Sequence, residues 1–341
     1  MKEKRAVSGL FMLAALLIVG GTAHPQELTS FRTSPEGGGA IDCLALSPDG
    51  KYLALGYRRR DNAVAIWETA TGKEIATLRG HDRWILVVGF SPDGKLLASG
   101  SADGTVKLWN VATWKEHASL PSPSGSGGVT SLAFSADGAL LAFGDTGGGV
   151  RVWDVRTGKE RQAFHGPEEG VRAVALSPDN KVLLAGTNRG TIILWEMETR
   201  KVRAVLKAGG DNSQIATMAL SPDGKMLASV TKLPECRLQL WDVETGKARA
   251  STKAWSDALK FSPDGKTLAV AATGSLFLFD AATFKPLSVM RIDKGHIFGL
   301  DYSSDSKFIV TGCNQGYVKV WDVAKILEQK APFDLPKDPA P

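Results

Sequence analysis

His81 and Asp103 are residue types that can perform acid–base chemistry, because an imidazole and a carboxylate can exchange a proton. A catalytic pair of this kind needs a nucleophile beside it, and none accompanies these two residues. The sequence also lacks His-Glu-x-x-His and Gly-x-Ser-x-Gly motifs, and its Cys and His residues do not cluster at metal-ligand spacing. The pattern therefore disfavours catalysis at this pair.

Two other motifs resemble ligand sites but fit turns better. Gly265-Lys266-Thr267 is similar to the end of a phosphate-binding loop, yet position 260 is Lys where that motif has Gly, and the segment is typical of a hairpin turn. Seven Asp residues recur in equivalent turns, but one carboxylate per turn cannot supply the six to eight oxygens that Ca²⁺ takes. We therefore expect no metal and no cofactor.

The turn that contains these Asp residues is the dominant repeat of the chain. It recurs every 41 to 44 residues, which divides the sequence into seven units. The seven copies are Ser47-Pro48-Asp49-Gly50, Ser91-Pro92-Asp93-Gly94, Ser135-Ala136-Asp137-Gly138, Ser177-Pro178-Asp179-Asn180, Ser221-Pro222-Asp223-Gly224, Ser262-Pro263-Asp264-Gly265 and Ser303-Ser304-Asp305-Ser306.

Two further motifs recur with the same period as this turn, a Thr-x-Lys turn and an aromatic residue at the end of the third strand. Together with the Asp turn they divide each unit into four short strands. A Thr-x-Lys turn follows the third strand in six units, starting at Thr71, Thr113, Thr157, Thr199, Thr245 and Thr283. Gly and Pro interrupt most windows long enough for a helix, which disfavours a helical solenoid. Four-stranded antiparallel units of this length are typical of a radial array. The third strands end in Trp67-Glu68, Trp109-Asn110, Trp153-Asp154, Trp195-Glu196, Trp241-Asp242, Phe279-Asp280 and Trp321-Asp322.

Together with Gly80-His81, these turns and Trp-Asp endings resemble the WD-repeat (WD40) family over residues 27–323. The resemblance implies an all-β, seven-bladed β-propeller of four-stranded antiparallel blades, used chiefly to hold other proteins. It also implies that His81, Ser99, Asp103 and Trp109 form a structural hydrogen-bond network in the second blade. The seventh blade matches only in part, with His296, Thr311 and Trp321 but Gln315 in the place of Asp.

The seventh unit lacks a fourth strand of its own, because Ala324-Lys325 and a Pro-rich end follow Trp321. Residues 27–32 parallel residues 74–79, the fourth strand of the first unit, in residue type. We therefore predict that the N-terminal segment completes the last blade and closes the ring, which removes an exposed sheet edge.

The N-terminus predicts export. A basic start, an uncharged run from Ala6 to Gly21 and small residues before His24 are typical of a secretory signal cut after Ala23. We expect a signal peptide at 1–23, a propeller at 24–326 and a Pro-rich flexible tail at 327–341, in a periplasmic or secreted protein. An uncleaved N-terminal anchor is the alternative.

The charge balance bears on partners. Three of the 41 basic and one of the 36 acidic side chains lie in the first 23 residues, so the remainder has a net charge of only +3. This disfavours nucleic acid as a partner. We expect a monomer that binds protein partners, including acidic ones at its Arg-bearing face. Family topology places one set of loops on one face, and Arg and aromatic residues dominate binding hot spots. The predicted partner-binding residues on this face are Tyr57, Arg58, Arg59, Arg60, Arg83, Trp84, Arg172, Arg189, Trp255, His296 and Phe298.

Three classes of function fit these patterns. The favoured class is a non-catalytic interaction scaffold. The second is an enzyme at the central channel, for which Asp42, Arg172 and Asp257 are the nearest ionisable residues. The third is a surface- or carbohydrate-binding module that uses Trp84, Trp114 and Trp255. Whether Cys43 pairs with Cys313 stays open, since three Cys residues leave at least one unpaired.

Overall fold

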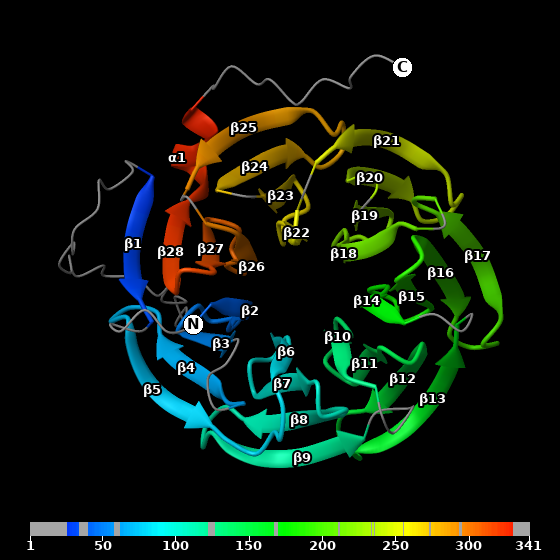
Figure 1. Ribbon diagram of the computed structural model, residues 1–341, viewed down its shortest axis with the longest axis horizontal. Helices are drawn as coiled ribbons and strands as arrows, with labels where there is room; N and C mark the ends of the chain where they lie inside the picture. The colour runs from blue at the N-terminus through cyan, green and yellow to red at the C-terminus, as the bar shows by residue number, and fades with distance from the viewer. Residues whose placement is uncertain are drawn as a thin grey trace, which may run out of the picture.

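The computed structural model describes residues 26–33, 40–57, 62–121, 127–166, 170–210, 212–232, 234, 236–254, 256–272, 274–292 and 295–329. In these ranges, seven four-stranded antiparallel sheets form a ring around a central axis (Figure 1). The predicted seven-bladed propeller is therefore confirmed. The predicted signal segment, 1–23, lies outside the described residues, as does the tail from residue 330.

Each blade contributes one strand to each of four concentric layers. The innermost strands are β2 (Ile41–Leu46), β6 (Ile85–Phe90), β10 (Val129–Phe134), β14 (Val171–Leu176), β18 (Gln214–Leu220), β22 (Ala258–Phe261) and β26 (Ile297–Tyr302). The second strands are β3 (Tyr52–Tyr57), β7 (Leu96–Ser101), β11 (Leu140–Asp145), β15 (Val182–Thr187), β19 (Met226–Lys232), β23 (Thr267–Ala272) and β27 (Phe308–Cys313).

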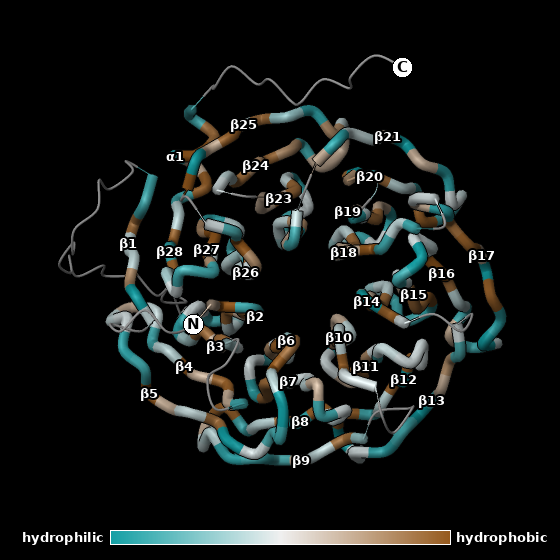
Figure 2. The backbone as a smooth tube through the Cα atoms, in the orientation of Figure 1, coloured by the Kyte–Doolittle hydropathy of each residue, from teal (hydrophilic) through white to brown (hydrophobic). Residues whose placement is uncertain are grey.

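The two outer layers complete the blades. The third strands are β4 (Val64–Glu68), β8 (Thr105–Asn110), β12 (Gly149–Asp154), β16 (Thr191–Glu196), β20 (Arg237–Asp242), β24 (Ser275–Asp280) and β28 (Tyr317–Asp322). The outermost strands are β5 (Lys73–Leu78), β9 (Lys115–Pro121), β13 (Lys159–His165), β17 (Val202–Lys207), β21 (Ala248–Lys253), β25 (Pro286–Arg291) and β1 (Glu27–Arg32). Hydrophobic residues recur along the inner strands of every blade, where both sheet faces are covered by neighbouring blades (Figure 2).

The repeated Asp turns join the first strand of each blade to the second. In blade two, Ser91 Oγ donates to Asp93 Oδ1 at 2.7 Å, and the same oxygen accepts the amide of Lys95 at 3.1 Å. Gly94 ends the turn at φ +69°, in the left-handed region that glycine favours. Ser306 takes φ +61° at the same position, so the degraded seventh copy keeps the turn geometry.

Glycines on the second strands allow the blades to approach closely. A Cβ on Gly144 of blade three would lie 2.4 Å from Val171 Cγ1 of blade four, which is inside contact distance. A side chain at this position would therefore force Val171 or the backbone to shift. The glycines at the same place in four other blades, whose Cβ would lie 2.7–3.0 Å from the first strand of the next blade, are Gly56, Gly100, Gly186 and Gly312.

The ring is closed by the N-terminal strand, as predicted. Strand β1 pairs with β28 in antiparallel register, with Thr29 opposite Val320 and Phe31 opposite Val318. The Phe31 ring also stacks on Trp67 of blade one, with centroids 5.4 Å apart. Strand β1 therefore joins the last blade by backbone hydrogen bonds and touches the first blade through a side chain.

A second contact, which the sequence did not predict, crosses the same seam. Asp301 Oδ2 on β26 accepts the amide of Leu46 on β2 at 3.0 Å, and its Oδ1 lies 3.0 Å from Lys260 Nζ on β22. Asp301 is 9% exposed. One buried carboxylate thus connects blades six, seven and one near the C-terminal ends of their first strands.

Helix α1 (Val323–Glu328) follows β28 and packs on blade six. The Asp322 side chain caps it by accepting the amide of Lys325 at 3.1 Å, and the carbonyl of buried Ile326 accepts Ser288 Oγ of β25 at 2.9 Å. The predicted boundary between propeller and tail, 326/327, therefore falls inside the helix, which continues to Glu328.

All three Cys residues are free thiols, so Cys43 and Cys313 form no disulfide. Burial is the main cause that raises the pKa of the Cys43 thiol to about 12.

Replacing Phe31 with Ala tests the contribution of the closing strand. Because the ring is half-buried against blade one, the variant should lose about 1–2 kcal/mol of unfolding free energy, measured by urea denaturation. Ser30→Ala, on an exposed position of the same strand, is the matched control and should change the midpoint little. Equal midpoints for Phe31→Ala and the wild type would contradict the role of β1 in closure.

The turn carboxylates predict a loss of stability in acid. Hydrogen bonds from Ser91 Oγ and the Lys95 amide hold the pKa of Asp93 below its ordinary value, and the pKa of the turn Asp is lowered in all seven blades. A folded pKa below the unfolded value of about 3.9 gives stability that is present above this pH and lost as pH falls through the folded pKa. Urea midpoints should therefore fall steeply below about pH 4. Asp93→Asn should flatten this slope, and a midpoint that stays constant from pH 5 to 2.5 would refute the explanation.

Candidate functional site

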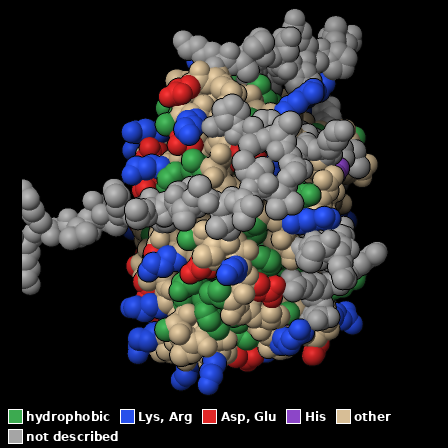
Figure 3. Space-filling view, turned by 90° about the vertical axis from the view of Figure 1, so that its left-hand side faces the viewer, with side chains coloured by type: hydrophobic (Ala, Val, Ile, Leu, Met, Phe, Trp, Pro, Cys, Tyr) green, Lys and Arg blue, Asp and Glu red, His purple; other side chains and the backbone are tan. Residues whose placement is uncertain are grey.

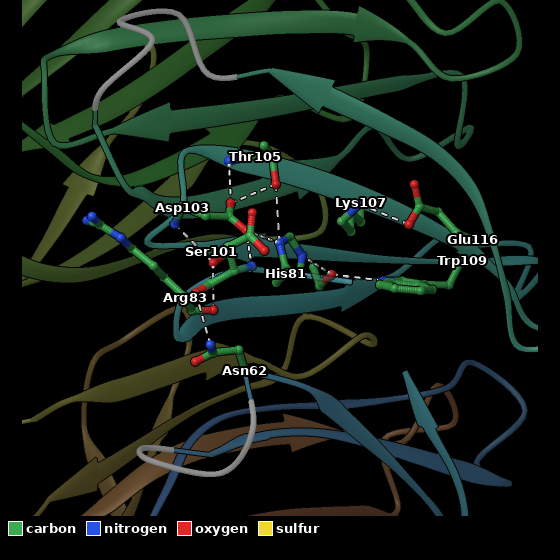
Figure 4. A network of polar contacts seen from close by, with 11 residues as sticks. Asn62, His81, Arg83, Ser101, Asp103, Thr105, Lys107, Trp109 and Glu116 are labelled. Carbon is green, nitrogen blue, oxygen red and sulfur yellow. Dashed lines mark hydrogen bonds and ion pairs between the residues drawn. The ribbon is translucent and has the colours of Figure 1, made fainter. Parts of the chain in front are cut away.

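A chain of buried hydrogen bonds runs through blade two. Trp109 Nε1 donates to Ser99 Oγ at 2.8 Å, Ser99 Oγ lies 2.8 Å from His81 Nε2, and His81 Nδ1 lies 2.8 Å from Asp103 Oδ2 (Figure 4). Thr105 Oγ1 donates to the other carboxylate oxygen of Asp103 at 2.7 Å. These contacts fit a neutral His81 that donates from Nδ1 to Asp103 and accepts from Ser99 at Nε2.

Burial keeps this imidazole neutral. The largest influence on His81 is its removal from water, which lowers its pKa below the ordinary value, while the hydrogen bond and charge of Asp103 act in the opposite direction. The arrangement of Asp103, His81 and Ser99 resembles a hydrolytic triad in its contacts. However, Ser99 is 0% exposed and its Oγ already accepts the indole N–H of Trp109, so a substrate has no access to this hydroxyl.

The network holds the loop that precedes β6. Asp103 Oδ2 accepts the amide of Asp82 at 3.0 Å, and Ser101 Oγ donates to the carbonyl of Arg83 at 2.9 Å. Asn62 of blade one adds a contact from the neighbouring blade, since its Nδ2 donates to the carbonyl of Asp82 at 2.9 Å. The backbone of this loop is thus bound on both sides. Sequence reasoning missed Ser101 and Asn62. Ser101 precedes Asp103 by two residues, the spacing that Ser91 and Asp93 have in the repeated turn, and this was a usable signal for Ser101 alone.

Arg83 and Trp84 are what this fixed loop presents. Trp84 is 53% exposed, and its backbone carbonyl accepts the amide of Ala102 at 2.9 Å. The Arg83 side chain is exposed and points away from the network (Figure 4). We define these two residues as the blade-two tip. An exposed aromatic and an Arg on an ordered backbone are the features of a binding hot spot.

The other predicted partner-binding residues are spread around the ring. Arg172, at the start of β14, and Arg189, between β15 and β16, are exposed. His296 and Phe298 are half-buried, with their rings stacked 6.0 Å apart. In blade seven Trp321 Nε1 donates to Thr311 Oγ1 at 2.9 Å.

One residue of the predicted set is corrected by the structure. Tyr57 is 2% exposed and packs in the core between blades seven and one, because it ends the buried strand β3. Its side chain is therefore not available to a partner on the surface. The predictions for Arg58, Arg59, Arg60 and Trp255 fall outside the described residues.

The ionisable residues considered for a channel enzyme come from three separate blades, one, four and six. Asp257 is paired with Lys232 of blade five, and Arg172 is exposed. Within the described ranges, no three His, Cys, Asp or Glu side chains gather closely enough to hold a metal ion. On the side of the ring that Figure 3 presents, basic and acidic side chains are interleaved. Most turn lysines, such as Lys95 beside Asp93 at 3.2 Å, have an acidic neighbour.

Ser99→Ala tests whether the network stabilises the blade. The variant leaves the buried Trp109 N–H and His81 Nε2 without a partner, which should cost about 1–3 kcal/mol of unfolding free energy. Ser229→Ala is the matched control, because Ser229 Oγ accepts Trp241 Nε1 at 2.9 Å in blade five, where there is no His. Ser99→Ala should lose more stability than Ser229→Ala in chemical denaturation. Equal losses would mean that His81 adds nothing.

Comparisons with known proteins give local matches. The chain is similar to Protein LST8 homolog of Drosophila melanogaster, with 38% identity over 95 residues, which are 25% of this chain and 30% of that protein. It is also similar to COMPASS component SWD1 of Saccharomyces cerevisiae, with 37% identity over 93 residues, covering 26% and 21% of the two chains. Eukaryotic translation initiation factor 3 subunit I of Aspergillus niger is 46% identical over 54 residues, 16% of each. The matches span less than a third of each relative.

These relatives contradict the predicted export. Translation initiation takes place inside the cell, and none of the names of these relatives describes an exported protein. The periplasmic or secreted location predicted from the N-terminus is therefore wrong. An apolar run behind a basic start is a compositional signal that also occurs without export. Within the described ranges, α1 spans six residues, and no helix there combines the length and apolarity that a membrane crossing requires.

A sequence model of the WD repeat shows the family to which the chain belongs. The WD domain, G-beta repeat model matches residues 25–68, 72–110, 113–154, 158–196 and 285–322, which together make up more than half of the chain. The first match joins β1 to blade one, in agreement with the position of this strand at the seam. The stretch between the matched ranges, residues 197–284, contains β17 to β24, which belong to four-stranded sheets like those of the matched blades. The chain belongs to the WD40-repeat family of β-propellers.

Proposed function

We propose that the protein is a non-catalytic scaffold that binds another protein at the blade-two tip. The observation that carries this proposal is the 53% exposure of Trp84 on a loop whose backbone is hydrogen-bonded from both sides. An indole normally costs free energy when it faces water, so its presentation on an ordered loop favours a contact surface. Because the loop is already ordered, a partner loses little free energy in fixing it.

The names of the relatives support this class of function. They include a component of COMPASS and a subunit of an initiation factor, both of which are parts of larger assemblies. The buried position of Ser99 supports the non-catalytic part, because the triad-like contacts of blade two then serve to hold the loop. Arg83 supports a partner with a carboxylate beside a pocket for the indole.

The proposal is tested by site-specific photo-crosslinking of the full-length chain in cells. A photoreactive phenylalanine analogue in place of Trp84 should give discrete protein adducts, which Arg83→Glu in the same chain should reduce by about tenfold. The matched control carries the analogue at Ile75, which is 45% exposed on outer strand β5, and should give no such adducts. No adducts from position 84, or the same adducts from both positions, would refute the site.

A further inference from the structure

Three blades carry an ion pair on one face of their two outer strands. In blade two, Lys107 Nζ on β8 lies 2.9 Å from Glu116 Oε2 on β9. Arg151 and Glu160 pair in the same way in blade three, as do Lys319 and Glu27 in blade seven at 3.4 Å. A charge on an outer strand discourages other strands from pairing with it.

Blade four has aliphatic side chains at these positions. In blade two, the register places Glu116 opposite Trp109 and Ser119 opposite Lys107. In blade four, the same register and the same bulge place Val202 opposite Trp195 and Val205 opposite Ile193. The face that carries the ion pair in blade two therefore carries Ile193, Val202 and Val205 in blade four. We define these three residues as the blade-four strip.

The blade-four strip is open to solvent at its outer side. Val202 is 55% exposed and Val205 is 54% exposed, whereas Ile193 is 2% exposed beneath them. Strand β17 lies on the outer circumference and pairs only with β16 among the described strands, so its other edge has unpaired backbone groups (Figure 1). Two exposed β-branched residues on an open edge form a template for another strand.

Basic residues flank the blade-four strip at both ends. Arg200 and Lys201 precede β17, and Lys207 ends it; all three side chains are exposed, and no described carboxylate forms an ion pair with them. Glu198 lies in the same turn as Arg200. The flanking charge is therefore net positive and complements an acidic segment.

We propose that β17 is a docking edge for an extended, acidic segment of a partner protein. The segment adds a fifth strand to blade four, places aliphatic side chains on the blade-four strip and sets Asp or Glu residues opposite Lys201 and Lys207. Main-chain hydrogen bonds supply affinity, and the side chains supply selectivity. This surface is separate from the blade-two tip and does not depend on the function proposed for it.

The test uses the full-length chain and a fluorescein-labelled peptide, Asp-Glu-Val-Thr-Val-Thr-Val-Glu-Asp, in fluorescence anisotropy titrations. The variant Val202→Glu with Val205→Ser should weaken binding by at least about tenfold, because it removes the two exposed apolar side chains of the strip and adds a charge of the same sign as the peptide. It carries the residue types that blade two has at the same register, Glu116 and Ser119, so the blade should still fold.

Two controls and a structural readout complete the test. Ile75→Ser, on outer strand β5, and Trp84→Ala, at the blade-two tip, should leave peptide binding unchanged. Hydrogen exchange should slow at the amides of β17 when the peptide is bound, which side-chain contact alone would not produce.

Several outcomes would overturn the proposal. These are no peptide binding at about 1 mM, equal binding by the double variant, equal binding of a peptide with Lys in place of Asp and Glu, or unchanged exchange in β17. Loss of peptide binding in Trp84→Ala would place the peptide at the blade-two tip instead. A concentration-dependent dimer that the double variant abolishes, without peptide binding, would assign the edge to a second copy of the chain.

Discussion

The whole ring depends on the pairing of β1 with β28, two strands from opposite ends of the described chain. Each blade covers its neighbours on both faces, so a gap at one seam would expose apolar surface on two blades and an unpaired edge on one. Phe31 on Trp67 and Asp301 on the Leu46 amide add side-chain contacts across the same seam. The closure needs no disulfide, since it uses the strand pairing and the glycine-mediated blade contacts found elsewhere in the ring.

Both proposed binding surfaces lie where single blades depart from this common plan. In blade two, a network of buried hydrogen bonds fixes the backbone of the loop before β6. This loop exposes Arg83 and Trp84. In blade four, aliphatic side chains replace the ion pair that blades two, three and seven carry at this register, while Arg203 of the same strand pairs with Glu196. Comparison of equivalent positions in the repeat shows the second departure. The register that places Lys107 beside Glu116 in blade two places Ile193, Val202 and Val205 on the same face in blade four. A repeat protein thus lets each blade serve as the reference for the others.

Local patterns predicted the fold well because each turn is specified by its own residues. The Pro and Gly of the repeated turns set φ directly, and the likeness of residues 27–32 to 74–79 was enough to place β1. What the sequence could not show depends on long-range packing. Burial of Tyr57 follows from contacts with blades seven and one, the Asp301 bridge joins residues from three blades, and the blade-four strip becomes visible only once the bulge fixes which residues share a face. The prediction of export relied on the basic start, the uncharged run and the small residues of the N-terminal segment, and the relatives contradict it.

Hydrogen exchange on the intact chain, followed amide by amide under native conditions, tests the closure most directly. If β1 is an integral strand of the seventh blade, its amides and those of β28 should exchange slowly and together, at rates set by opening of the ring rather than by local fraying. Exchange of the β1 amides within seconds, while β28 stays protected, would show that the N-terminal strand is only loosely attached and would contradict the account.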